Sequence, residues 1–184
     1  MVDERIIVAG FGGQGVMMIG KLLAHAGMLE HRNVSWLPSY GPEMRGGTAN
    51  CHVIVSEKEI AAPIVTQATC VIAMNLPSLE KFESIVKSGG RLFINSSLIR
   101  QHAHRTDVSA LEIPVNDIAN RQGSLRVANV VMLGAYITLS NVVKKDTILE
   151  AIQDVLGEHK QHLLDINVNA LEEGIAFAKG DTYA

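Results

Sequence analysis

Three glycines near the start of the chain have the spacing of a loop that binds phosphate groups. The apolar run 5–9 leads into Gly-Phe-Gly-Gly-Gln-Gly at 10–15, and a helical pattern follows. Gly10, Gly12 and Gly15 match G-x-G-x-x-G, a strand-to-helix turn that brings backbone N–H groups close to an anion. A tight turn without a ligand is the alternative, because this pattern alone has low specificity. The candidate cofactor-binding residues here are Gly10, Gly12, Gly13, Gln14 and Gly15.

The second apolar run argues against a dinucleotide as the ligand. In dinucleotide-binding folds, a carboxylate about 20 residues after the glycines holds a ribose hydroxyl. Here the apolar run 34–37 ends in Pro38 and Ser39, and no acidic residue stands there. The glycine turn is therefore expected to bind an anion such as a phosphate group, and not NAD.

A second segment combines charged residues with glycines. Residues 39–48 read Ser-Tyr-Gly-Pro-Glu-Met-Arg-Gly-Gly-Thr, so Glu43, Arg45 and Gly46 are close together. Glycines beside an arginine let a backbone approach a ligand or another chain closely. Three roles are open to the charged pair: to fix the loop shape, to bind an anionic group, or to pair across a subunit interface. A solvated loop with a local ion pair is the simplest alternative. We include Glu43, Arg45 and Gly46 among the candidate binding residues.

Charge and composition argue against two classes of partner. The net charge is −3, only 4% of the residues are aromatic, and no basic run is present. We therefore expect no nucleic-acid partner and no membrane partner. The longest apolar run, 130–139, is far shorter than the ~20 residues that span a bilayer. The charged residues near the start do not resemble a signal peptide. These features predict a cytoplasmic protein.

The cysteines and histidines do not form a metal site in the sequence. Cys51 and Cys70 each lie in an apolar run and are expected to be small core residues. An iron–sulfur cluster held by this chain alone would need about four thiolates and is excluded. His52 is expected to face away from the apolar side of its strand, within reach of the glycine turn. No cofactor or metal is expected on the chain alone, and no catalytic residue stands out. The remaining paired histidines are expected at the surface: His102, His104, His159 and His162.

Apolar periodicity predicts an α/β fold with a mixed sheet, in one domain that covers residues 1–184. The run 49–56 alternates like a half-buried strand. It is expected to pair antiparallel with 34–37, because no crossover helix separates the two. Gly89 and Gly90 are expected to follow the end of a helix. A capping box is expected at Asp146–Glu150. The predicted strands are 5–9, 34–37, 49–56, 70–74, 91–95 and 112–115; the predicted helices are 13–30, 78–86, 116–121, 129–140, 146–157 and 164–175.

Three motifs in this order resemble one protein family. They are the glycine turn 10–16, the segment 39–47, and Asn-Val-Val-Met-Leu-Gly at 129–134. Together they resemble the gamma subunit of 2-oxoacid:ferredoxin oxidoreductases, over roughly residues 4–178. The Glu-Met-Arg-Gly-Gly form of the second motif resembles the 2-oxoglutarate and branched-chain branches more than the pyruvate branch.

The resemblance implies a three-layer α/β/α sandwich with a mostly parallel, mixed sheet and a helical C-terminal tail. It also implies a complex that oxidatively decarboxylates a 2-oxoacid to an acyl-CoA and reduces ferredoxin. In that family, thiamine diphosphate and magnesium lie between the alpha and beta subunits, and iron–sulfur clusters belong to beta and to a ferredoxin-like delta subunit. Alpha, beta and delta subunits and ferredoxin are the implied partners, and coenzyme A is a substrate. The alternative is a stand-alone, Rossmann-like module that binds a nucleotide or phosphate without catalysis.

Overall fold

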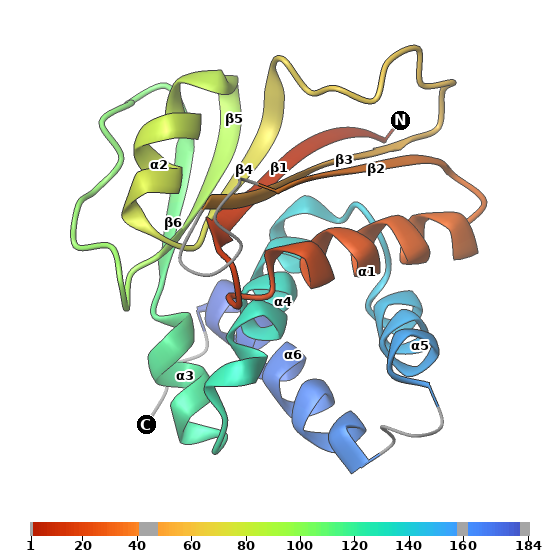
Figure 1. Cartoon of the computed structure of the whole chain (residues 1–184), viewed down its shortest axis with the longest axis vertical. Coiled ribbons are helices and arrows are strands. Elements are labelled where there is room, and N and C mark those ends of the chain that lie inside the picture. Colours follow the sequence, from red (N-terminus) through yellow and green to blue (C-terminus); the bar gives the residue numbers. More distant parts are fainter. Residues whose placement is uncertain (1, 41–47, 158–161, 181–184) are drawn as a thin grey trace.

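A six-stranded mixed sheet forms the centre of the computed structural model, which describes residues 2–40, 48–157 and 162–180 (Figure 1). The strand order is β2-β3-β1-β4-β5-β6. β1, β4, β5 and β6 are parallel neighbours, and β3 runs antiparallel to both β1 and β2. The expected mostly parallel, mixed sheet is therefore confirmed. The strands are β1 (Asp3–Phe11), β2 (Asn33–Tyr40), β3 (Thr48–Ser56), β4 (Ala68–Ala73), β5 (Val86–Asn95) and β6 (Ser109–Ile113).

Helices cover the two faces of the sheet unequally (Figure 1). One face carries α1, α4, α5 and α6, with α3 beside them, and the other carries the short helix α2. The segment that contains Ile60 and Val65 adds apolar cover on the α2 side. The structure thus has three layers, α/β/α, and the layer that contains α2 is thin. The helices are α1 (Val16–Leu29), α2 (Leu76–Phe82), α3 (Val115–Arg121), α4 (Ala128–Ser140), α5 (Lys145–Leu156) and α6 (Leu164–Lys179), with short 3-10 turns at Glu83–Ile85 and Leu125–Val127.

β4 is buried along its whole length, and β1 is buried from Ile6 to Gly10, because both faces of the sheet are covered there. In β1, Ile6 and Val8 belong to the core beneath α1 and α4, whereas Ile7 and Ala9 belong to the core beneath α2. β3 was expected to be half-buried, but nearly all of it is buried, since covering segments pack on both faces. None of the helices in the described ranges is long and apolar enough to cross a membrane.

Helix α4 is buried on all sides over residues 128–137, as its apolar sequence predicts, and Leu139 in its last turn is exposed. It contacts α6 through glycines on both helices. A Cβ on Gly134 would lie 2.2 Å from the carbonyl oxygen of Leu171, and a Cβ on Gly174 would lie 1.9 Å from that of Val131. The two helix backbones therefore approach each other more closely than any side chain would permit.

Two local expectations are wrong. Gly89 and Gly90 do not follow directly on a helix, because α2 ends at Phe82 and both glycines lie inside β5. A Cβ on Gly90 would lie 2.7 Å from Val86 Cγ1 and 2.8 Å from the Lys87 carbonyl oxygen within β5, and 2.9 Å from the Thr69 carbonyl oxygen in β4. Crowding from both strands therefore excludes a side chain at this position. The expected capping box is also absent: α5 starts at Lys145, after an N-cap at Lys144 without a side-chain cap.

Candidate functional site

The carboxyl ends of β1 and β4 form the crevice where α/β sheets usually bind ligands. The chain leaves β1 toward α1 on one face and leaves β4 toward α2 on the other face (Figure 1). Because the two connections diverge, the ends of the strands are not covered by either helix. The glycine turn follows β1 at this point, and Asn75 follows β4.

The turn between β1 and α1 requires glycine at two positions. Gly13 has φ +96° and Gly15 has φ +74°, a backbone region that residues with a Cβ rarely adopt. The turn is closed by a hydrogen bond from the Gln14 N–H to the Phe11 carbonyl (3.2 Å). Gly12 and Gly13 are exposed at its tip. The expected strand–turn–helix unit is therefore confirmed, with the helix starting at Val16 and not at Gly13.

The side chain of Gln14 joins the two sides of the crevice. Its Oε1 accepts hydrogen bonds from the Phe11 N–H (2.6 Å) and from Asn75 Nδ2 (3.3 Å), and its Nε2 donates to the Met74 carbonyl (3.1 Å). Gly10 lies beneath this side chain, and a Cβ there would come within 2.7 Å of Gln14 Oε1. The structure thus places Gln14 and Gly10 in the support of the turn and leaves the backbone of Gly12 and Gly13 facing outward.

Asparagines complete the support of the crevice. Asn75 caps α2 by accepting from the Ser78 N–H (2.9 Å), and buried Asn95 donates to the Met74 carbonyl (3.2 Å). Asn129, at the start of α4, donates to the Gly15 carbonyl (3.4 Å). The Oδ1 atoms of Asn95 and Asn129 are buried without a hydrogen-bond partner in the described part of the chain. No motif in the sequence predicts a site role for these asparagines, although a polar asparagine at the end of an apolar strand is a usable signal.

A pocket of about 170 Å³ opens beside the turn. It is lined by Gly13, Gln14, Met74, Asn116, Leu125, Arg126 and Ala128. Arg126 supplies a positive charge, and the exposed Gly13 backbone adds to the polar surface. None of these lining residues is a carboxylate, histidine, cysteine or hydroxyl residue. The pocket therefore has the chemistry to bind a small anionic group, and within the described part of the chain its lining supplies no nucleophile and no general acid or base.

The candidate residues Glu43, Arg45 and Gly46 lie outside the described residues. The described residues on either side of this segment show where it begins and ends. Thr48 pairs with Phe11 of β1, and Tyr40 pairs with Ala49, which in turn pairs with Gly10 of β1. Both flanks of the segment therefore lie at the same end of the sheet as the glycine turn, which follows the carboxyl end of β1.

The other candidate groups are structural. Both cysteines are buried, as expected, and burial raises the pKa of the Cys51 thiol to about 11 and that of Cys70 well above its ordinary value. The expectation that His52 lies within reach of the glycine turn is wrong, because its Nδ1 accepts a hydrogen bond from the Val65 N–H (2.9 Å). Burial lowers the pKa of His52. Exposed His102 pairs with Glu112 at 2.6 Å. The described residues contain no cluster of three His, Cys, Asp or Glu side chains suited to a metal ion.

Comparisons with known sequences identify relatives along almost the whole chain. The family model described as "Pyruvate ferredoxin/flavodoxin oxidoreductase" matches residues 5–177. Ketoisovalerate oxidoreductase subunit VorA of Methanothermobacter thermautotrophicus is 37% identical over 178 residues, which cover 96% of this chain and 37% of VorA. 2-Oxoglutarate synthase subunit KorC of Methanocaldococcus jannaschii is 32% identical, with 96% of this chain and 94% of KorC covered. The chain thus spans little more than a third of VorA but nearly all of KorC.

Solved structures share the fold. The gamma subunit of a keto/oxoacid ferredoxin oxidoreductase from Geobacter sulfurreducens matches with a TM-score of 0.82 and 28% identity, over 96% of this chain and 99% of that one. The 2-oxoglutarate:ferredoxin oxidoreductase from Magnetococcus marinus, solved with 2-oxoglutarate, coenzyme A and succinyl-CoA bound, matches with a TM-score of 0.90 and 27% identity. That match covers 100% of this chain and 32% of the longer one.

Proposed function

Since the chain belongs to the pyruvate ferredoxin/flavodoxin oxidoreductase family, as a gamma subunit of the 2-oxoacid:ferredoxin type, we propose that it is the non-catalytic subunit of a complex that converts a 2-oxoacid to an acyl-CoA. In this proposal the complex reduces ferredoxin and contains alpha, beta and delta-type partner chains. The family membership confirms the resemblance carried by the three motifs. We further propose that the complex is cytoplasmic.

One observation about the crevice carries the proposal. The pocket beside the glycine turn offers an exposed backbone and Arg126, but the described residues of its lining include no nucleophile and no general acid or base. Such a site binds or positions an anionic group without performing the chemistry on it. A subunit of this kind needs partners that supply the reacting groups, which agrees with a role inside a larger complex.

The residues of this chain fit some of the implied cofactors and not others. Cys51 and Cys70 are buried and stay protonated, so they do not fit an iron–sulfur cluster. We therefore assign the clusters, thiamine diphosphate and magnesium to the partner chains. The exposed turn at Gly12 and Gly13, with Arg126 beside it, fits a phosphate group of coenzyme A. Coenzyme A in the Magnetococcus marinus relative supports this assignment.

We extend this proposed site to the segment that contains Glu43, Arg45 and Gly46. Its flanks lie beside the glycine turn through the pairs of Thr48 and Tyr40 in the sheet. The Arg45 guanidinium, which can bond two oxygens at once, binds an anionic group of coenzyme A or of a partner subunit. In this proposal Glu43 and Gly46 belong to the same binding segment as Arg45.

The subunit role is tested by purifying the native complex through a tag on this chain. We expect thiamine-diphosphate-binding and ferredoxin-like chains to copurify, and ferredoxin reduction to require both a 2-oxoacid and coenzyme A. The chain by itself should have no oxidoreductase activity. Recovery of this chain alone from native cells, with a bound nucleotide or phosphate, would favour the stand-alone binding module.

The coenzyme A contact is tested with Arg126→Gln in the assembled complex. Loss of one charge-assisted hydrogen bond should raise the apparent KM for coenzyme A by roughly tenfold and leave the KM for the 2-oxoacid unchanged. Arg100→Gln, which removes another exposed arginine, is the matched control. Equal KM values for coenzyme A in the two variants would remove Arg126 from the site.

A further inference from the structure

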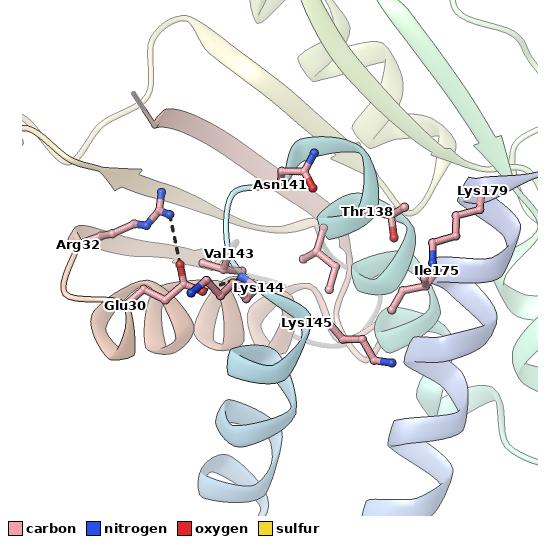
Figure 2. A pocket seen from close by; sticks show the side chains of 10 residues that line it. Glu30, Arg32, Thr138, Asn141, Val143, Lys144, Lys145, Ile175 and Lys179 are labelled. Atoms are coloured by element: carbon pink, nitrogen blue, oxygen red, sulfur yellow. Dashed lines mark hydrogen bonds and ion pairs between the residues drawn. The ribbon is translucent and has the colours of Figure 1, made fainter.

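A second pocket lies at the other end of α1 and is much larger (Figure 2). Its volume is about 510 Å³. Residues just after α1, after α4 and at the end of α6 line it. Since α1 has 14 residues with a rise of about 1.5 Å each, the pocket lies about 20 Å from the glycine turn. We call it the basic pocket, after the side chains of Arg32, Lys144, Lys145 and Lys179.

Positive charge dominates the lining of the basic pocket. Its described residues include four cations and one acid, Glu30. Both oxygens of Glu30 are already used, because Oε1 accepts from the Lys144 N–H (2.6 Å) and Oε2 accepts from Arg32 Nη2 (3.2 Å). Glu30 therefore forms an ion pair with Arg32, drawn as a dashed line in Figure 2, and its other oxygen holds the backbone at the start of α5.

Much of this charge has no internal partner. Lys145 forms an ion pair with Glu172, but no carboxylate among the described residues pairs with the ammonium groups of Lys144 and Lys179. The Nη1 atom of Arg32 is enclosed and lacks a hydrogen-bond partner in the same part of the chain. A cluster of cations is costly to assemble by mutual repulsion, and an anion bound between them relieves that cost.

The backbone and the apolar floor fit the same kind of ligand. Helix α5 begins at this pocket without a side-chain cap, so the positive end of its dipole adds to the lysine charges. Ile137, Val143 and Ile175 provide an apolar floor. The pocket therefore has one surface for negative charge and one for an uncharged group.

We propose that the basic pocket binds a phosphorylated small molecule of about the size of a nucleoside diphosphate. Its volume lies in the usual range of roughly 300–1,000 Å³ for small-molecule sites, and a single phosphate ion would fill only a small part of it. The phosphate groups lie between Lys144, Lys179 and the start of α5, and the uncharged part lies on the apolar floor. This site is separate from the glycine turn and does not depend on the function proposed above.

The proposal is tested by calorimetric titration of the full chain with pyrophosphate and with ADP at constant ionic strength. Saturable binding is expected for both, and tighter binding of ADP would assign the apolar floor to its nucleoside. The double variant Lys144→Gln/Lys179→Gln should bind at least about tenfold more weakly. Lys21→Gln/Lys58→Gln, with two exposed lysines elsewhere, removes the same charge and should bind like the wild type.

Backbone amide shifts locate the bound anion and complete the test. Addition of pyrophosphate should move the amide signals of Lys145 and Asp146 in the wild type, and this response should be lost in Lys144→Gln/Lys179→Gln. Absence of saturable binding at millimolar probe overturns the proposal. It is equally overturned if both double variants bind alike, or if only the amides of Gly12–Gly15 respond.

Discussion

Replacement of Gln14 by alanine should destabilise the fold by about 1–2 kcal/mol. The side chain takes part in three hydrogen bonds, to the Phe11 N–H, Asn75 Nδ2 and the Met74 carbonyl. At about 1 kcal/mol each, these contribute about 3 kcal/mol. The freed side-chain entropy of roughly 1–2 kcal/mol offsets part of this loss, and water can enter the half-buried site.

Urea unfolding followed by circular dichroism measures this effect. Gln14→Ala should lower the unfolding midpoint with an unchanged denaturant slope, whereas Gln101→Ala, which truncates an exposed glutamine, should stay within about 0.5 kcal/mol of the wild type. If the two alanine variants unfold at the same urea concentration, the bridge across the crevice does not hold β1 and β4 together.

A second substitution separates the acceptor from the donor of Gln14. Gln14→Glu keeps the oxygen that accepts from Phe11 but replaces the donor to Met74 with an oxygen. A protonated carboxyl group can still donate to that carbonyl, whereas a carboxylate repels it. Relative to the wild type, this variant should lose stability as the pH rises above about 5. A pH-independent difference from the wild type would contradict the donor role.

Three further predictions concern the glycine turn, the contact between α4 and α6, and a buried thiol. Gly13→Ala should cost about 1–2 kcal/mol from its positive φ alone, and Gly15→Ala clearly more in the same urea assay, because its Cβ would lie 2.6 Å from the Asn129 side chain. Gly134→Ala should lower Tm by roughly 6–12 °C in calorimetry, since α6 must move away from α4. Burial raises the pKa of Cys51 to about 11, so the folded state keeps a proton that the unfolded state loses. Relative to Cys51→Ala, the protein should therefore lose about 2–3 kcal/mol of stability as the pH rises from 9.0 to about 11.

The sequence predicted those features that depend on local periodicity and on backbone geometry. The run 70–74 is apolar on both faces, which is typical of a covered central strand, and β4 is buried throughout. The backbone of the turn requires glycine at Gly13 and Gly15 because both have positive φ values. The spacing of the glycines in the sequence predicted the turn. The antiparallel pairing of β2 and β3 followed from the short connection between them.

The support of the site was not predictable in the same way, because it depends on contacts between distant residues. Asn129 reaches the Gly15 carbonyl across 114 positions of the chain, and Gln14 reaches Met74 across 60. The sequence predicts Gly90 beyond the end of a helix, yet this glycine is required by crowding from Val86 and Lys87 in its own strand and from Thr69 in β4. No local pattern distinguishes a glycine required by a tight turn from one required by a neighbouring strand.

The central place of β1 has a consequence for synthesis of the chain. β1 is made before both of its neighbours in the sheet, β3 and β4, and Ile6, Ile7 and Val8 are fully buried once they pair. β4 ends at Ala73, 62 residues after β1 ends at Phe11, which corresponds to roughly 3–12 s of translation at about 5–20 residues per second. Since β3 ends earlier, at Ser56, β1 can first pair on one side only, and its other side stays without a partner strand until β4 has been made.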